Sequence, residues 1–344
     1  MAVVRAAGDR GDGTGRDVVI AHPCDGTTER RKGDGLNNSV PSFRPSVALL
    51  GADAGGSHST VVIGTPDSIL GRADGPGAPM RPGGAAAAAA VLAETARRAA
   101  KQADVELPVA RAVVGAAGAG REQEQAELAA ALVAAGMARR VRVRADGEVA
   151  LATAFGAGSG ILVNAGTGSI AYARDGSGVL HRAGGYGWQL GDEGGGYWLG
   201  RRALELAARA QDGRGEGSTL LARLLGALGL QRFDDLIRWS ATATPSQVAA
   251  LAPHVLNAAR EGEVVARRVV DDAASELTEL VTALVRYFPG TGPVAVAVAG
   301  GLLLPHSPLT AALSERLEGV KRAVLVHDRI DPAVGALRLA AELE

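Results

Sequence analysis

The sequence predicts an α/β protein built from two similar lobes, and three observations lead to this prediction. A strand, a glycine-rich turn and a second strand form a unit near residue 50, and the same unit returns at residues 161–174. Strand-like and helix-like segments alternate after each unit. The chain has 344 residues, which is enough for two domains of ordinary size with a substantial core.

The composition excludes several classes of protein. Lys and Arg number 36 against 37 Asp and Glu, and no basic run is interleaved with aromatics, so we expect no nucleic-acid or acidic-membrane partner. The longest apolar run, Val294–Leu304, is far shorter than the roughly 18–20 residues of a membrane span. The single cysteine, Cys24, excludes an internal disulfide framework and a cysteine metal cluster, and a reducing, cytoplasmic setting is expected.

The first lobe is expected at residues 46–150, after a polar segment, 1–45, that lacks an apolar period and is predicted to be a disordered extension. Its strands are expected where β-prone residues cluster, and its helices where apolar residues follow a helical period and a glycine such as Gly136 follows the end. In chain order these are strands at Val47–Gly51, Ser59–Ile63 and Ser68–Leu70, a helix at Ala85–Ala103, a strand at Arg111–Gly115, a helix at Glu122–Ala135, a strand at Val141–Val143 and a helix at Glu148–Phe155.

The second lobe is expected at residues 151–330. Its elements are strands at Ile161–Asn164, Ile170–Arg174 and Val179–Ala183, a long helical region from Tyr197 to Phe288, a buried strand in "PVAVAVAGGLLLP", and a last strand at Val324–His327. A closing helix, Pro332–Leu343, has proline in its first turn. This helix, within residues 331–344, is a candidate to complete the first lobe instead.

The first glycine turn, "GADAGGSHST", has the chemistry of a phosphate site. A Rossmann turn or a P-loop would continue into a helix, but the next segment here is β-like and no GxxxxGK[ST] motif occurs. A hairpin tip still offers converging backbone N–H groups at Gly55 and Gly56 and a hydroxyl at Ser57, while Asp53 is placed to hold Mg²⁺ through water. The alternative is an ordinary hairpin turn, which Asp and Gly also favour.

The second turn, "NAGTGS", has the same form and leaves the same alternative. Gly166 and Gly168 allow a close approach to the backbone, and Thr167 and Ser169 supply hydroxyls. One such tip in each lobe would grip a triphosphate from both sides. Later, "VAVAGGLLL" ends a strand in Gly300–Gly301, where a flat base fits against the backbone or where strand and helix simply pack closely.

Two further stretches carry candidate substrate groups. Asp146, in "VRVRADGEVALATAF", follows a strand and is placed either to accept a hydroxyl proton in phosphoryl transfer or to cap the next helix. "GGYGWQLGDEGGGYWLGRRAL" is too rich in glycine for a helix or strand. Its Tyr186, Trp188 and Asp192 offer an aromatic surface and a carboxylate to a sugar, although Asp192 is also a candidate helix cap.

These four glycine-rich stretches, in this order, resemble the N-acetylglucosamine kinase and BadF/BadG/BcrA/BcrD-type ATPase family, within the wider group of sugar kinases, Hsp70 and actin. The resemblance covers residues 46–342, and "GGYGWQLGDEGGGYWLG" is its most specific segment. It implies two ribonuclease-H-like (actin-like ATPase) lobes around a central nucleotide and substrate cleft.

The resemblance also implies an activity, the phosphorylation of an amino-sugar 6-hydroxyl with ATP and Mg²⁺. The expected acceptor is N-acetylglucosamine or a relative such as glucosamine or an N-acetylmuramic-type sugar; the alternative is a BadF-type ATPase or nucleotide-dependent regulator without a sugar. Asp146 would be the base, Mg²⁺ would lie near Asp53 and Thr167 would face the phosphates. The implied sugar pocket is lined by Gly185, Tyr186, Gly187, Asp192 and Asp146. Family members are often dimers, and Gly217–Phe288 is the expected contact.

The sequence departs from the family's sugar-contacting residues. Ala78 and Pro79 stand where an Asn is common, Ile170 replaces a polar residue, and Tyr186 replaces a Trp. These changes leave the ATP motifs intact and bear on the choice of sugar. Two related groups are excluded because they need cysteines: the dehydratase and reductase activators with an iron–sulfur cluster, and the repressor and kinase group with a zinc cluster.

Overall fold

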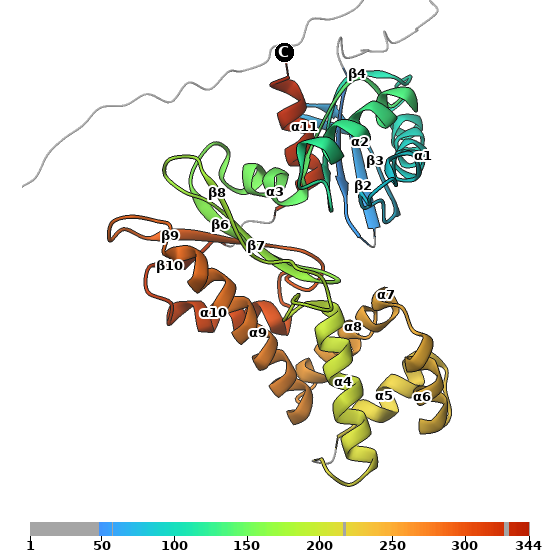
Figure 1. Ribbon diagram of the computed structural model, residues 1–344, viewed down its shortest axis with the longest axis vertical. Coiled ribbons are helices and arrows are strands. Elements are labelled where there is room, and N and C mark those ends of the chain that lie inside the picture. The colour runs from blue at the N-terminus through green and yellow to red at the C-terminus, as the bar shows by residue number, and fades with distance from the viewer. Residues whose placement is uncertain (1–47, 57, 216–217, 327–329, 344) are drawn as a thin grey trace, which may run out of the picture. The chain divides into compact units, whose positions relative to one another are not determined.

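The structure is a computed structural model that describes residues 48–56, 58–215, 218–326 and 330–343 (Figure 1). The predicted extension at residues 1–45 lies outside the described residues. So do Ser57, Val47 at the start of the first predicted strand, and His327 at the end of the last one.

The first sheet has five strands in the order β3-β2-β1-β4-β5. The strands are β1 (Leu49–Ala54), β2 (His58–Thr65), β3 (Ser68–Pro76), β4 (Val109–Ala116) and β5 (Ala138–Ala145). The first three form an antiparallel meander, whereas β4 and β5 run parallel to β1. Parallel strands need crossover connections, which here are the helices α1 (Ala85–Ala103) and α2 (Glu122–Ala134).

The two faces of this sheet are covered by different helices because side chains alternate along each strand. Leu50 and Ile63 point to the core shared with α1 and α2. On the other face Leu49 packs with Leu337 of α11 (Pro332–Ala341). A Cβ at Gly51 would lie 2.2 Å from the Ala333 carbonyl oxygen, so glycine permits this close approach of helix to strand.

The second sheet repeats the topology of the first. Its order is β10-β9-β6-β7-β8, with β6, β7 and β8 antiparallel and β9 and β10 parallel to β6. Its strands are β6 (Gly160–Ala165), β7 (Ser169–Arg174), β8 (Leu180–Gly184), β9 (Val294–Ala299) and β10 (Ala323–Leu325). The helices after β8 and β9 are α4 (Gly196–Gln211), α5 (Leu220–Leu228), α6 (Phe233–Thr242), α7 (Pro245–Ala249), α8 (Ala252–Arg260), α9 (Val264–Val285) and α10 (Pro308–Glu318).

Helix α3 (Asp146–Phe155) contacts the cores of both sheets. Val149 packs in the same cluster as Leu49 and α11, whereas Leu151 packs with Leu162 of β6 and Ala297 of β9. Helix α3, whose first residue is Asp146, is therefore packed against both sheets.

Most predicted elements are confirmed, with small differences at their ends. The helix at Ala85–Ala103 is found with the predicted bounds, whereas the short strand predicted at Ser68–Leu70 extends to Pro76 because its pairing with β2 continues to that residue. The single helical region predicted after Tyr197 is divided into α4 to α9.

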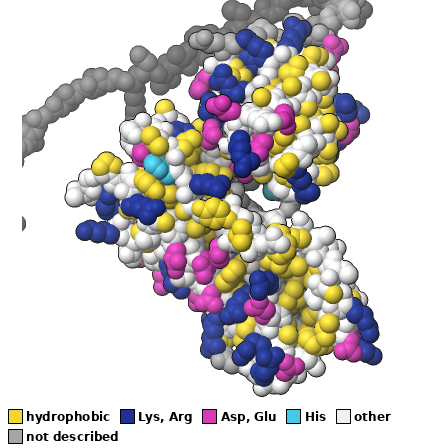
Figure 2. Space-filling view, in the orientation of Figure 1, with side chains coloured by type: hydrophobic (Ala, Val, Ile, Leu, Met, Phe, Trp, Pro, Cys, Tyr) yellow, Lys and Arg dark blue, Asp and Glu magenta, His cyan; other side chains and the backbone are white. Residues whose placement is uncertain are grey.

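The described part of the chain shows two features that bear on partners. None of its helices has both the length and the apolar character needed to cross a bilayer. On the face shown in Figure 2, basic and acidic side chains are interspersed, without a large field of one sign.

Candidate active site

A cavity of about 1090 Å³ brings together the loops at the carboxyl ends of strands from both sheets. In open α/β sheets this edge is where ligands bind. The volume is at the upper end of the roughly 300–1,000 Å³ typical of a small-molecule pocket, so it has room for a nucleotide together with a second small substrate. The predicted site residues that line it are Asp53, Gly55, Gly56, Asp146, Gly166, Thr167, Gly168, Ser169, Gly185, Asp192, Gly300 and Gly301.

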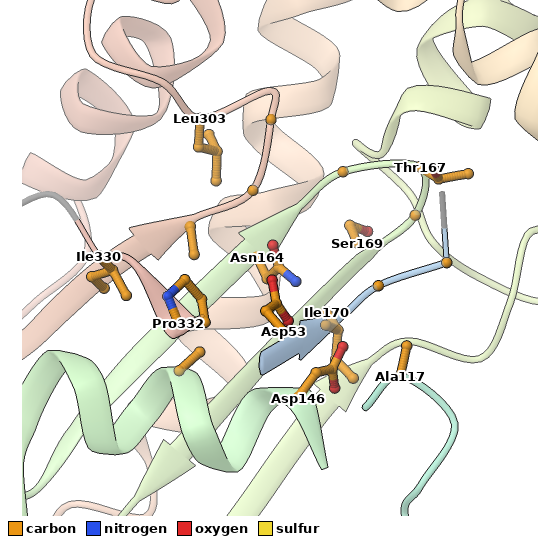
Figure 3. A pocket seen from close by; sticks show the side chains of 18 of the residues that line it. Asp53, Ala117, Asp146, Asn164, Thr167, Ser169, Ile170, Leu303, Ile330 and Pro332 are labelled. Carbon is orange, nitrogen blue, oxygen red and sulfur yellow. The ribbon is translucent and has the colours of Figure 1, made fainter. Parts of the chain in front are cut away.

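Asp53 and Asp146 lie close together at the end of β1 (Figure 3). Burial raises the pKa of Asp53 to about 7, and the negative charges of Asp146 and Asp331 add to this effect. A cation beside the carboxylate would reverse the effect by favouring its ionised form. Within the described ranges no group of three or more His, Cys, Asp or Glu side chains is placed to hold a metal, so protein ligands alone do not form a cage.

These features fit Mg²⁺ bound together with phosphate. That ion usually keeps several waters and takes one or two carboxylates plus substrate phosphates. Asp53 would supply such a carboxylate, and the glycine turns beside it would leave room for the phosphates. Among the described residues, and apart from its chain neighbours, no atom lies within 4 Å of a Cβ built at Gly56 or Gly166, so the space above both turns is open.

Asp146 is the first residue of α3, and its carboxylate borders the cavity. The N-cap position is Ala145, so the alternative in which Asp146 serves as the N-cap is wrong. Oδ1 of Asp146 accepts hydrogen bonds from the Gly147 N–H at 2.8 Å and from the Tyr172 hydroxyl at 3.4 Å. Burial raises the pKa of Asp146 above its ordinary value, and these two hydrogen bonds oppose that rise.

The second glycine turn is held by the first amides of α4. The N–H groups of Gly196 and Tyr197 donate to the carbonyls of Gly166 and Thr167 at 2.8 and 2.9 Å. The Ser169 hydroxyl donates to the carbonyl of Glu193 at 2.5 Å. The turn is thus fixed in place before any ligand binds, which lowers the entropy lost on binding.

The glycine-rich loop between β8 and α4 meets this turn at Asp192. Asp192 has a left-handed φ of 61°, and its Oδ1 accepts from the Gly187 N–H at 3.2 Å. The helix α4 is preceded by Gly195 as N-cap, which makes the alternative of Asp192 as helix cap wrong. Tyr186 and Gly187 do not line the cavity, and Tyr186 is 58% exposed; their contact with sugar stays a prediction.

The two glycines after β9 differ in what they accommodate. Gly300 has a φ of 96°, and a Cβ there would lie 2.3 Å from the carbonyl oxygen of Ala165. Close packing therefore requires glycine at this position. Gly301 faces open space in the cavity, where a flat base has room. Ser57, the remaining predicted phosphate residue, lies outside the described residues.

Comparison with known proteins places this site in a family. The model of the BadF/BadG/BcrA/BcrD ATPase family matches residues 50–340. The chain belongs to the BadF/BadG/BcrA/BcrD ATPase family. The fold expected for this ATPase family, two actin-like lobes around a nucleotide and substrate site, is confirmed by the two sheets of matching topology.

Two curated proteins with similar sequences are named as sugar kinases. An N-acetylmuramic acid/N-acetylglucosamine kinase of Clostridium acetobutylicum is 37% identical over 147 residues, which are 42% of this chain and 48% of that protein. An N-acetyl-D-glucosamine kinase of Dictyostelium discoideum is 30% identical over 193 residues, 53% of this chain and 59% of that protein. The chain thus spans about half the length of the curated relatives it matches.

Solved structures agree over more of the chain. A candidate N-acetylglucosamine kinase from Chromobacterium violaceum has a TM-score of 0.70 and 31% identity, and the match covers 86% of this chain and 99% of that one. A ROK family glucokinase from Streptomyces griseus, bound to glucose and AMPPNP, has a TM-score of 0.54 at 18% identity over 86% of this chain and 99% of that one. The second likeness shows the fold alone. Membership of the ATPase family implies that this chain uses ATP.

Several residues that line the cavity were not predicted from the sequence. They are Arg72, Asn164, Tyr172, Arg182 and Asp331. Asn164 lies inside the quoted "NAGTGS" turn and could have been found there. Tyr172 and Arg182 are cross-strand partners, and Arg72 pairs with Asp331 at 2.6 Å across the chain; no spacing in the sequence signals either pair.

Proposed function

We propose that this protein is a cytoplasmic, ATP- and Mg²⁺-dependent kinase that phosphorylates the 6-hydroxyl of an amino sugar, N-acetylglucosamine or a close relative such as glucosamine. The observation that supports this most is the cavity itself. It brings the partly buried carboxylate of Asp146 together with two open glycine turns, one from each sheet, and the glycine-rich loop with Asp192. A nucleotide-dependent regulator without a sugar acceptor needs neither the carboxylate nor the loop.

In this proposal the two glycine turns bind and align the phosphates of ATP through backbone N–H groups. Asp53 would hold Mg²⁺ through water, and the ion would neutralise charge on the phosphates. Asp146 accepts the proton of the sugar hydroxyl while the oxygen of that hydroxyl forms a bond to the γ-phosphorus. The bond from that phosphorus to the β-γ bridging oxygen breaks, and ADP leaves with both electrons of that bond.

The departures from the family's sugar contacts bear on which sugar is accepted. Ala78 is 2% exposed and does not line the cavity; its N–H donates to the Gly55 carbonyl at 3.1 Å. It therefore supports the first glycine turn and offers no side chain to a ligand. Ile170 does line the cavity, with an apolar side chain packed against Gly185. We expect weaker selection among acyl groups and hydroxyl patterns than a fully polar pocket provides.

The deciding experiment measures ADP release from Mg²⁺-ATP with N-acetylglucosamine, glucosamine, N-acetylmannosamine, N-acetylmuramic acid and glucose in turn. We expect stimulation by at least one amino sugar and its loss in Asp146→Asn. Tight ATP binding without any response to sugar would contradict the kinase and favour the regulator.

Gly168 gives a test of the contact between the second turn and the loop. A Cβ at this position would lie 2.2 Å from Oδ2 of Asp192, so Gly168→Ala must displace the turn or the carboxylate. Overpacking of this kind costs about 1–3 kcal/mol, and we expect kcat/KM for the sugar to fall by roughly 10- to 100-fold. Steady-state kinetics measure this.

Gly176→Ala is the matched control, because Gly176 lies in the β7–β8 turn and a Cβ there would meet nothing within 4 Å. Equal kinetics for the two alanine variants would show that the contact between Gly168 and Asp192 has no functional weight.

A further inference from the structure

Tyr172 of β7 brings a hydroxyl from the second sheet to the proposed base. Its O–H donates to Oδ1 of Asp146 at 3.4 Å, and the Gly147 N–H donates to the same oxygen at 2.8 Å. Two donors from different elements thus converge on one carboxylate oxygen. Fixing that oxygen limits rotation of the carboxylate about its bond to Cβ.

The residue after Asp146 is shaped to admit the tyrosine ring. A Cβ at Gly147 would lie 1.9 Å from Cε2 and 2.1 Å from Cδ2 of Tyr172. The ring therefore lies against the backbone of the first turn of α3. Glycine is less favourable than alanine in a helix by about 1 kcal/mol. The close approach of the Tyr172 ring explains why glycine nevertheless occupies this helical position.

Tyr172 is a donor rather than a base. Burial and the negative charge of Asp146 raise the pKa of its hydroxyl above the ordinary value of 10.0, while the positive charge of Arg182 opposes this. The hydroxyl therefore keeps its proton throughout the neutral pH range. It is available to donate to the ionised carboxylate.

We propose that Tyr172 is a positioning residue for the Asp146 carboxylate. The inference rests on the proposed kinase function. Through its hydrogen bond to Oδ1, Tyr172 holds the carboxylate in the orientation that receives the proton of the sugar hydroxyl. As that proton leaves, the sugar oxygen bonds to the γ-phosphorus and ADP departs. The bond also joins a strand of the second sheet to the start of α3, which follows directly on β5 of the first sheet.

The charged groups around this pair come from five elements or segments. They are Asp53 on β1, Arg144 on β5, Glu148 on α3, Arg182 on β8 and Asp331 before α11. Arg144 and Glu148 are paired with each other at 3.4 Å. All of them remain when the Tyr172 hydroxyl alone is removed, so a change in the pH profile of that variant reports on the hydroxyl.

The test is Tyr172→Phe, with kcat measured as a function of pH for the sugar that the wild-type protein accepts. Hydrogen bonds to charged groups are among the stronger ones, but this bond is long at 3.4 Å, so we expect kcat to fall by no more than roughly tenfold at neutral pH. Because the hydroxyl favours the ionised carboxylate, the acid limb of kcat should move to higher pH. KM for ATP should stay unchanged.

Tyr287→Phe is the matched control. Tyr287 lies outside the cavity lining, stacks on His181 and accepts a hydrogen bond from Arg286, so its loss of a hydroxyl should leave kcat and the acid limb as they are.

Gly147→Ala is the second variant, because its Cβ displaces the ring without changing Tyr172, and it should move the acid limb in the same direction. Gly147→Ala also tests the positioning role of Tyr172 if Tyr172→Phe does not fold.

An unchanged acid limb in Tyr172→Phe, or in Gly147→Ala if only that variant folds, would overturn the inference while leaving an active wild-type kinase in place. A wild-type protein with no sugar-dependent ADP release would overturn the proposed function, and the positioning role with it. The two failures are therefore distinguished by the wild-type assay alone.

Discussion

Replacement of Asp146 by asparagine is expected to lower kcat for sugar phosphorylation by roughly 10²- to 10⁴-fold, the usual contribution of a positioned general base. Asparagine has nearly the same shape, and its side-chain oxygen can still accept from Gly147 and Tyr172, but it cannot take up the hydroxyl proton. The proposed nucleotide contacts involve other residues, so KM for ATP should change little. Steady-state ADP release at saturating sugar measures both constants.

The same residue sets the expected pH dependence of the wild-type protein. Burial raises the pKa of Asp146 above its ordinary value, and a base must be ionised to accept a proton. The value of kcat should therefore fall as the pH is lowered through this raised pKa. Asp67→Asn, a change in the exposed turn between β2 and β3, is the control and should keep wild-type kinetics. If Asp146→Asn keeps them as well, Asp146 is not the base.

Replacement of Asp53 by asparagine is expected to stabilise the folded protein at alkaline pH when metal and nucleotide are absent. The folded-state pKa of Asp53 is raised from 3.8 to about 7, so folding favours the protonated carboxyl. The stability that this adds is fully present below pH 3.8 and is lost as the pH rises through about 7. The change in pKa from 3.8 to about 7 corresponds to about 4 kcal/mol of unfolding free energy, at 1.36 kcal/mol for each pH unit. This is an upper limit, because the carboxylate borders the cavity.

Urea unfolding of wild type and Asp53→Asn in a chelating buffer, at about pH 4 and about pH 8, measures this effect. The difference between the two proteins should be small at the lower pH and should favour asparagine at the higher one. Asp67→Asn again controls for the loss of a carboxylate at the surface. A difference that does not grow with pH would contradict the raised pKa of Asp53.

The parts of the site that the sequence predicted are those whose residues are neighbours along the chain. The turns after β1 and β6 each hold their glycines within a few positions, so the pattern "GADAGG" or "NAGTGS" carries the signal by itself. Asp146 was found because it follows a strand, although α3 begins at Asp146 and not at the predicted Glu148.

The parts that were missed depend on how strands align and where the chain returns. Tyr172 and Arg182 face each other only because β7 and β8 pair in one register, which a short turn does not reveal. Asp331 reaches the cavity because the chain returns from the second sheet to the first just before α11. An apolar stripe on a helix predicts that it is buried, but does not predict which sheet buries it.

The packing of α11 has a consequence for how the chain folds during translation. Leu49, Val62 and Val113 lie on a face of the first sheet that is covered by Leu337 and its neighbours, which follow the second sheet in the chain. The ribosome must therefore synthesise the second sheet before α11 can cover that apolar face. Until then the nascent first sheet exposes an apolar surface to chaperones and to aggregation, so its folding is completed only after the second sheet has been synthesised.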